Sequence, residues 1–293
     1  MNAMATDTLR RFMLEHAHVR GEWVHLDESW QTLLNRTEYP PVIKQVLGEA
    51  LTAAVLLSAT IKHTGALVMQ IRGEGPINLL VVQATAQGTV RGLAQWNREP
   101  TGTSLPELFG QGQMAITLEN QQTGERYQSL IPLEGDSLSA ALESYFVRSE
   151  QLPTRLWLVA NDKTAAGILL QRLPQANTSE EDWQRVSMLL DTVTAQELAH
   201  LEAEDMLYRL FHEEQVRLFD PKPIQFYCGC SRERVLTMLR SIGQAEAETI
   251  LQEQGNITVV CEFCNATYVL DAIDVSQLFT TIVPGSDALH QQP

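Results

Sequence analysis

The sequence lacks the motifs of the common enzyme classes. No Gly-x-Ser-x-Gly nucleophile elbow, Walker phosphate-binding loop or His-Glu-x-x-His helix occurs in its 293 residues. Gly73-Glu74-Gly75 lacks the third glycine of a dinucleotide-binding loop, and a hairpin turn is the better interpretation. Its histidines are scattered, and His200 and His212 are expected on solvated helix faces. Because no nucleophile–base pattern is present, the sequence favours a protein that is not an enzyme.

Basic residues are also scarce. The chain has 21 Lys and Arg against 36 Asp and Glu, which gives a formal net charge of −15. An acidic surface repels phosphate backbones and anionic lipids, and no run of Lys or Arg offsets it. We therefore expect no nucleic-acid partner and no membrane partner.

A secretory leader and a long apolar run are absent too. Residues 1–11 are polar, and the longest apolar run, between Glu49 and Lys62, has about a dozen residues where about 20 span a bilayer. These features predict a cytoplasmic protein. In a reducing cytoplasm, four clustered cysteines indicate metal ligands or redox groups more than a structural disulfide framework.

The first part of the chain predicts an α+β domain over residues 1–175, with a mostly antiparallel sheet. A helix is expected from Pro40-Pro41 to Gly65, and it becomes apolar on all sides over residues 53–57, which indicates deep burial. A second helix is expected from Asp136 or Ser137 to about residue 150. The β-rich segments between turn residues predict strands at 66–71, 77–82, 89–96, 114–118, 127–133, 154–160 and 167–173.

Residues 176–224 have the composition of an acidic helical linker. Capping boxes begin at Ser179 and Thr194, and apolar side chains follow at helical spacing. From residue 178 to residue 220, eleven acidic residues face three arginines. Short, highly charged helices are marginal alone and depend on docking, which places the stripes around Trp183 and Leu207 against another surface. Pro221 and Pro223 mark the end of this linker.

All four cysteines lie in the last part, residues 225–293, which we interpret as a small zinc-binding module. Cys228 and Cys230 form one close pair, and Cys261 and Cys264 form the other after thirty intervening residues. Zinc prefers four thiolates in a tetrahedron, and two close pairs supply them. The second pair lies between β-rich stretches, as on a zinc-knuckle hairpin, and two helices are expected between the pairs. A module this small rarely stabilises itself by more than about 3–5 kcal/mol, so its folding is expected to depend on the metal.

Other interpretations of the cysteines stay open at this point. They could be ordinary buried thiols, or Cys261-x-x-Cys264 could be the redox motif of a thiol-disulfide oxidoreductase, although no thioredoxin-like βαβ unit lies nearby. Arg232 and Arg234 follow Cys230 closely. They either favour reactive thiolates or balance the charge of a four-thiolate zinc centre. A binding module whose zinc is purely structural is the main alternative function.

The sequence closely resembles the bacterial redox-regulated 33 kDa heat-shock chaperone family over nearly its whole length. The most specific similarity is the Cys-x-Cys and Cys-x-x-Cys signature with residues 230–234, Cys-Ser-Arg-Glu-Arg. Residues 145–154, Tyr-Phe-Val-Arg-Ser-Glu-Gln-Leu-Pro-Thr, and residues 167–171, Gly-Ile-Leu-Leu-Gln, also look like blocks of this family. Residues 73–76 and 212–214 do so as well.

The resemblance implies a mechanism for an ATP-independent holdase of the oxidative stress response. In the reduced form Cys228, Cys230, Cys261 and Cys264 would bind zinc, and the chaperone would be inactive. Oxidation would then join Cys228 to Cys230 and Cys261 to Cys264, and zinc would leave. The module and linker would unfold, and the protein, usually a homodimer when active, would hold unfolding client proteins until they refold.

Overall fold

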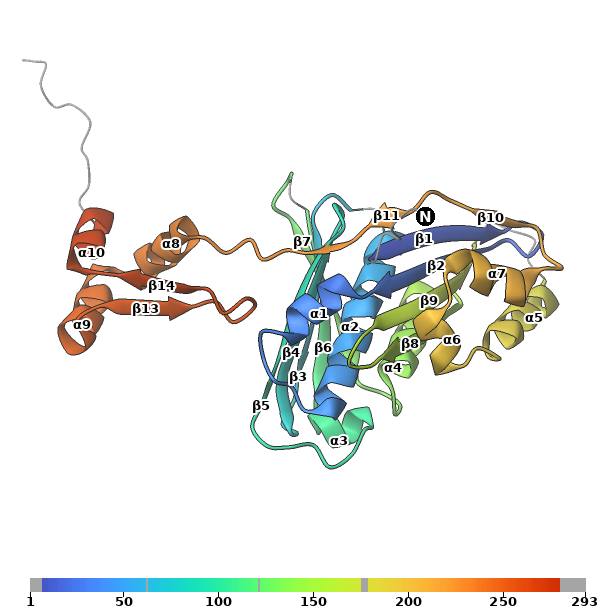
Figure 1. Ribbon diagram of the computed structural model, residues 1–293, viewed down its shortest axis with the longest axis horizontal. Coiled ribbons are helices and arrows are strands. Elements are labelled where there is room, and N and C mark those ends of the chain that lie inside the picture. The colour runs from blue at the N-terminus through green and yellow to red at the C-terminus, as the bar shows by residue number, and fades with distance from the viewer. Residues whose placement is uncertain (1–6, 62, 121, 175–178, 280–293) are drawn as a thin grey trace, which may run out of the picture. The chain divides into compact units, whose positions relative to one another are not determined.

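The computed structural model describes residues 7–61, 63–120, 122–174 and 179–279. The chain divides into two compact units, Met1–Tyr227 and Cys228–Pro293 (Figure 1). The predicted helical linker, residues 176–224, falls within the range of the first unit. The α+β class with mostly antiparallel sheets is confirmed.

The first unit contains two six-stranded sheets. Sheet A has the order β10-β1-β2-β9-β8, with β11 also paired to β1. Its strands are β1 Thr8–Leu14, β2 Val19–Leu26, β8 Thr154–Ala160, β9 Ala165–Arg172, β10 Val216–Leu218 and β11 Lys222–Pro223. Sheet B has the order β12-β5-β4-β3-β6-β7. Its strands are β3 Ala66–Arg72, β4 Ile77–Thr85, β5 Thr89–Trp96, β6 Gln113–Glu119, β7 Arg126–Pro132 and β12 Gln225–Phe226. All these pairings are antiparallel except that of β12 with β5.

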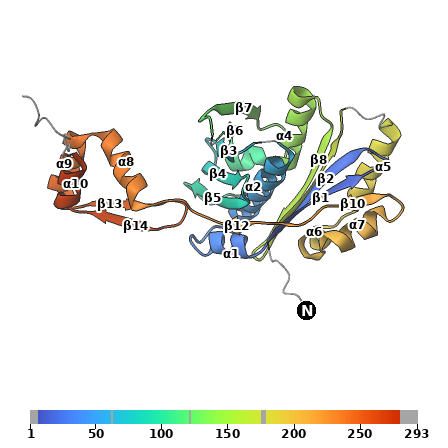
Figure 2. The ribbon, with the colours of Figure 1, turned by 90° about the horizontal axis from the view of Figure 1, so that it is seen from above.

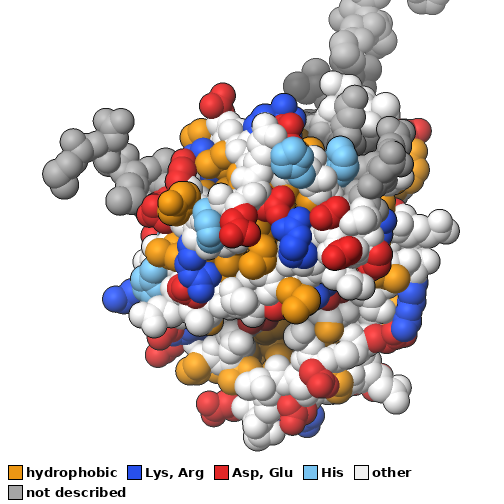
Figure 3. Space-filling view, turned by 90° about the vertical axis from the view of Figure 1, so that its right-hand side faces the viewer, with side chains coloured by type: hydrophobic (Ala, Val, Ile, Leu, Met, Phe, Trp, Pro, Cys, Tyr) orange, Lys and Arg blue, Asp and Glu red, His pale blue; other side chains and the backbone are white. Residues whose placement is uncertain are grey.

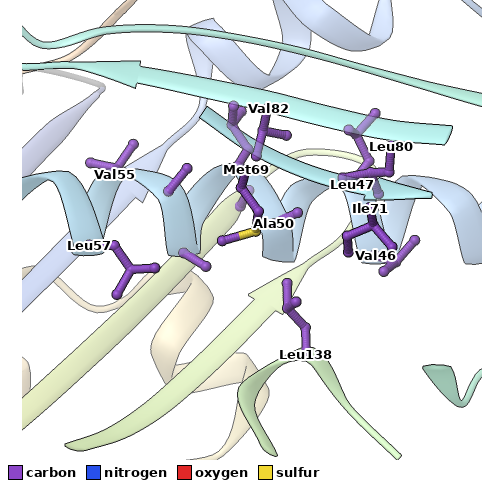
Figure 4. Packing of buried hydrophobic residues seen from close by; sticks show 14 of the residues in the cluster. Val46, Leu47, Ala50, Val55, Leu57, Met69, Ile71, Leu80, Val82 and Leu138 are labelled. Atoms are coloured by element: carbon purple, nitrogen blue, oxygen red, sulfur yellow. The ribbon is translucent and has the colours of Figure 1, made fainter. Parts of the chain in front are cut away.

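Helix α2, Pro41–Thr60, packs between the two sheets (Figure 2). It begins with proline in its first turn, as the sequence predicts, and most of its residues are buried. Figure 4 shows its side chains among those of β3 and β4 in one apolar core. Gly48 allows a close approach to β8, because a Cβ there would lie 2.4 Å from the Cβ of Ala160.

Helix α2 also corrects one sequence argument. The uninterrupted apolar run is short, but the whole 20-residue helix is long and apolar enough to cross a membrane by length and composition. A buried core helix meets the same criterion, and α2 lies inside this core.

Three helices cover the other face of sheet A: α5 Glu180–Leu190, α6 Ala195–His200 and α7 Ala203–Phe211. Their apolar stripes contain Val186, Leu190 and Leu207, as predicted, and they pack on Phe12 and Trp23 of the sheet. The side of the molecule with α5 and α7 faces the viewer in Figure 3, where acidic, basic and hydrophobic side chains are interspersed. This docking agrees with the dependence on another surface that the sequence predicts.

The remaining helices of the first unit are α1 Glu28–Leu34, α3 Leu105–Phe109 and α4 Leu138–Tyr145. Ser137 caps α4 by accepting a hydrogen bond from Ala140 N, as predicted, and the helix continues as a π-helical turn over Phe146–Glu150. The strands predicted between residues 66 and 173 are all present, within a few residues of the expected bounds. The apolar pattern of the sequence does not predict β1 and β2. Arg10 and Arg11 interrupt the pattern in β1.

The second unit consists of helices α8 Arg232–Ile242, α9 Gln244–Gln254 and α10 Ala272–Phe279, with a hairpin of β13 Ile257–Val260 and β14 Thr267–Leu270. Gly243 and Gly255 end the first two helices, as predicted, and both have positive φ. Among its described residues the buried core has seven members: Val235, Leu239, Ala247, Ile257, Leu270, Val275 and Leu278. Tyr268 and Phe279 are partly buried against them. So small an apolar core provides little stability unless a bound metal or a disulfide adds to it.

Candidate metal centre

The two cysteine pairs are positioned by different local structures. Cys228 and Cys230 lie in the extended segment just before α8, where Ser231 caps the helix by accepting from Arg234 N. Cys261 and Cys264 lie in the turn between β13 and β14, which the bond from Cys261 N to Ala266 O closes at 2.9 Å. This turn is the knuckle hairpin that the sequence predicts, and it directs both sulfurs to one side.

The fold brings all four sulfurs together. The four Sγ atoms lie within 4.8 Å of one another, and every one of these residues is half-buried. The distance is 3.6 Å between the sulfurs of Cys228 and Cys261, and 3.2 Å between those of Cys230 and Cys264. Zinc–sulfur bonds of about 2.3 Å in a tetrahedron require sulfurs about 3.8 Å apart. The arrangement therefore fits a metal ion held by four thiolates, with shifts of about 0.2 and 0.6 Å at these two contacts.

The thiols differ in how readily they ionise. The Tyr268 hydroxyl donates a hydrogen bond to Cys230 Sγ at 3.1 Å, which lowers the pKa of Cys230 to about 7 and raises that of Tyr268 to about 12. Burial raises the pKa of Cys264 to about 12 and also raises the pKa of Cys261. A cation at the centre would offset this cost because it favours all four thiolates at once.

The roles of two residues near the cysteine cluster differ from those that the sequence predicts. The sequence predicts that Arg232 acts on the thiolates, but its side chain pairs with Asp274 at 2.6 Å and donates to Val269 O at 3.0 Å. It therefore ties α8 to α10 and β14. Tyr268 was missed, although its position four residues after Cys264, on a strand with its side chain toward the core, is a usable signal.

The linker helices are held by charges as well as by apolar contacts. Asp191, at the end of α5, accepts hydrogen bonds from Arg155 at 2.9 Å and from the Trp157 indole at 3.1 Å. Glu180 and Glu204 pair with arginines of sheet A, at 2.8 and 2.7 Å. Three of the linker's acidic side chains thus pair with arginines of sheet A. His200 and His212 are exposed, as predicted.

Two polar atoms buried beneath these helices have no hydrogen-bond partner. They are the indole Nε1 of Trp23 and the hydroxyl oxygen of Ser187. Each such atom costs about 1–3 kcal/mol relative to its hydrated state. The docked arrangement of α5–α7 is therefore less stable than its apolar contacts alone would make it.

Known proteins with similar sequences or folds match nearly the whole chain. Residues 7–271 match the family model described as Hsp33 protein. A 33 kDa chaperonin of Nitrosococcus oceani is 50% identical over 274 residues, which are 94% of each chain. A 33 kDa chaperonin of Methylobacillus flagellatus is 46% identical over 97% of this chain and 99% of its own. The crystal structure of a 33 kDa chaperonin from Thermotoga maritima has a TM-score of 0.81 at 24% identity, over 93% of this chain and 97% of its own, and shows the same fold.

Proposed function

The chain belongs to the Hsp33 family of chaperones, and we propose that it is a redox-regulated, ATP-independent holdase. The observation that carries this proposal is the cluster of four half-buried sulfurs in a unit with a thin apolar core. Such a unit is stable only while the cluster is intact. In functional terms, residues 1–175 would form the core domain, 176–224 the linker and 225–293 the redox switch.

In the reduced state, Cys228, Cys230, Cys261 and Cys264 would hold one zinc ion. When bound, zinc keeps the thiolates deprotonated and adds about 10–16 kcal/mol to the folding of a small module. Tyr268 supports this state by donating its hydrogen bond to Cys230 Sγ. Arg232 supports it by joining α8 to α10. The half-buried sulfurs remain within reach of a small oxidant such as hydrogen peroxide.

Oxidation would remove the ligands in pairs. A thiolate attacks one peroxide oxygen to give a sulfenic acid, and hydroxide leaves with the electron pair of the O–O bond. A second thiolate then displaces hydroxide from that sulfur, so two sulfurs lose two electrons in total and form one disulfide. The family resemblance implies the pairs Cys228–Cys230 and Cys261–Cys264. Partners this close in sequence also stay near each other when the unit unfolds.

Unfolding of the second unit would release the acidic helices. The chain passes from α7 through β10, β11 and β12 and enters the second unit at Cys228. Undocking would expose the apolar residues shared by sheet A and α5–α7, and it would let Trp23 and Ser187 bond to water. Unfolding clients of unrelated sequence would bind this apolar surface, while the linker's charge keeps the open form soluble.

The family resemblance extends the proposal to a cytoplasmic protein that is a homodimer when active. The net charge of −15 supports unfolded proteins, and not nucleic acid or membranes, as its partners. No catalytic turnover is part of the proposed function.

Light scattering from a thermally aggregating client enzyme tests the proposal. Equal amounts of the reduced, zinc-loaded chain and the peroxide-treated chain are compared at elevated temperature, and released zinc is measured alongside. Suppression by the oxidised form alone, reversed by a reductant, is the expected result. Equal suppression by both forms would make the zinc purely structural and would refute redox control.

A further inference from the structure

Strand β7 forms one edge of sheet B (Figure 2). Most of its residues are exposed. Within the part of the chain that the structure describes, β7 pairs only with β6. Residues 126–128, 130 and 132 are all exposed, and Tyr127 and Leu130 retain 67% and 57% of their full accessibility. An edge strand this accessible presents main-chain groups that another extended chain can bind.

The register identifies which main-chain groups face outward. In an antiparallel sheet, the N–H and C=O of one residue point to the same side, and the side alternates along the strand. Asn120 N donates to Glu125 O at 2.9 Å just before β7 begins. Alternation then directs Tyr127 and every second residue after it toward β6. The N–H and C=O groups of Gln128 and Leu130 therefore face the open edge.

The features that usually protect an edge are missing from the middle of β7. Between Arg126 and Pro132 the strand has neither a charge nor a proline. Proteins commonly place lysine, proline or a bulge on such an edge to prevent pairing with other chains. Among the described strands, those at the other sheet ends are short or occupied: β10 has three residues, β12 has two, and β8 donates from Leu156 N to Glu143 Oε1 at 2.7 Å.

A cavity of about 230 Å³ lies on the inner face of β6 and β7. Polar side chains, among them Arg20, Glu150 and Gln171, contribute to its lining. Its apolar lining includes Leu57, Ile61, Ile116, Leu118, Tyr127, Phe146 and Leu152. A strand added to β7 would lie about 4.8 Å from it and continue this face of the sheet. Every second side chain of the added strand would then point toward the cavity side. The cavity thus provides apolar surface for a side chain, while the edge provides hydrogen bonds.

We propose that β7 receives an extended segment of an unfolded polypeptide as an additional strand of sheet B. This inference rests on the proposed holdase function and names one surface that serves it. Main-chain hydrogen bonds do not depend on the client's sequence, so the edge suits clients of many kinds. Arg126 pairs with Glu119 at 3.0 Å, and Arg148 pairs with Glu134. The two arginines nearest the edge are therefore engaged within the chain.

This surface would act differently from the linker. The edge is exposed while α5–α7 are docked, so it is available before oxidation. A single added strand binds weakly, and the apolar surface released with the linker would add affinity after oxidation. The reduced chain should therefore bind an unfolded client weakly through β7, and the oxidised chain should bind it tightly through both surfaces.

The test uses the full chain and reduced, carboxymethylated α-lactalbumin, a permanently unfolded probe, with fluorescence anisotropy as the readout. Leu130→Pro removes an outward N–H without removing a bond to β6, and proline is tolerated at such edge positions. Leu130→Thr keeps the N–H but changes the side chain. Comparing the two variants therefore distinguishes the main-chain contribution to binding from the side-chain contribution. We expect Leu130→Pro to raise Kd of the oxidised chain about tenfold and Leu130→Thr to raise it by less than about threefold, which are losses of about 1.4 and 0.7 kcal/mol.

Equal Kd values for Leu130→Pro and the unsubstituted chain would overturn the edge proposal. Failure of the unsubstituted oxidised chain to bind the probe would instead refute the holdase function. Amide exchange in the unsubstituted chain keeps the test valid if Leu130→Pro misfolds. The amides of Gln128 and Leu130 should exchange quickly in the free chain and slowly with the probe bound. Protection that depends on protein concentration without probe would assign the edge to a second copy and overturn the proposal.

Discussion

Releasing the linker helices without oxidation should activate the chaperone. Phe211 on α7 is 1% exposed, and its ring centroid lies 6.4 Å from that of Phe12 on β1. Substitution of a buried phenylalanine by alanine typically costs about 3–5 kcal/mol. Because the Phe211 ring packs α7 against sheet A, this cost falls on docking. It would lower the docking equilibrium constant about one hundred- to several thousandfold.

Phe211→Ala should therefore hold clients while still reduced and zinc-loaded. The assay is light scattering from an aggregating client enzyme, with limited proteolysis of residues 180–211 to report undocking and zinc content to show that the cysteine centre is intact. Tyr208→Ala on the same helix is the matched control, because Tyr208 is 75% exposed. It should change neither proteolysis nor holding.

Two results would refute this reasoning. If Phe211→Ala exposes the linker to protease but does not suppress aggregation, the surface beneath α5–α7 is not the activating surface. If Tyr208→Ala has the same effect as Phe211→Ala, burial on sheet A does not explain the change.

Three further predictions concern the cysteine centre and a buried carboxyl group. After peroxide treatment, peptide mass mapping should find Cys228–Cys230 and Cys261–Cys264 disulfides; links between the two pairs would contradict the proposed pairing. Tyr268→Phe should weaken zinc binding about tenfold in a chelator competition, because the hydrogen bond to Cys230 is removed; unchanged affinity would exclude this role. Burial raises the pKa of Glu22 to about 7 from its ordinary 4.5, so the folded chain binds this proton more tightly than the unfolded chain. Its contribution to stability is therefore full below about pH 4.5 and is lost as the pH rises through 7. Between pH 5 and pH 8, the free energy of unfolding of Glu22→Gln, measured in urea, should rise by about 3 kcal/mol relative to that of the unsubstituted chain. Parallel pH profiles of the two chains would contradict this.

The linker and the edge strand show why tertiary structure matters to function. The stripe of apolar residues on α7 indicates a docking face, but the partner residues Phe12 and Trp23 lie nearly two hundred residues earlier in the chain. The sequence of β7 predicts a strand, yet only the sheet order places that strand at an edge. In both cases the surface available to a client depends on packing between distant segments.

Features that depend on neighbouring residues can be predicted from the amino-acid sequence alone. Two-residue and three-residue cysteine spacings indicate metal-ligand pairs, and proline, glycine and capping residues mark the helix ends within a few positions. The sequence also indicates that α2 is buried, because that helix is apolar on several sides.

The partners of the charged and polar side chains depend on the packing of distant segments. The tertiary structure places Arg232 on Asp274 and directs the Tyr268 hydroxyl to Cys230. It also forms β1 despite its two arginines, since Arg10 donates to Phe219 O and Arg11 to Ala59 O. Spacing along the chain constrains groups a few residues apart, whereas these partners are about 40 to 200 residues apart and meet only when the sheets and helices pack.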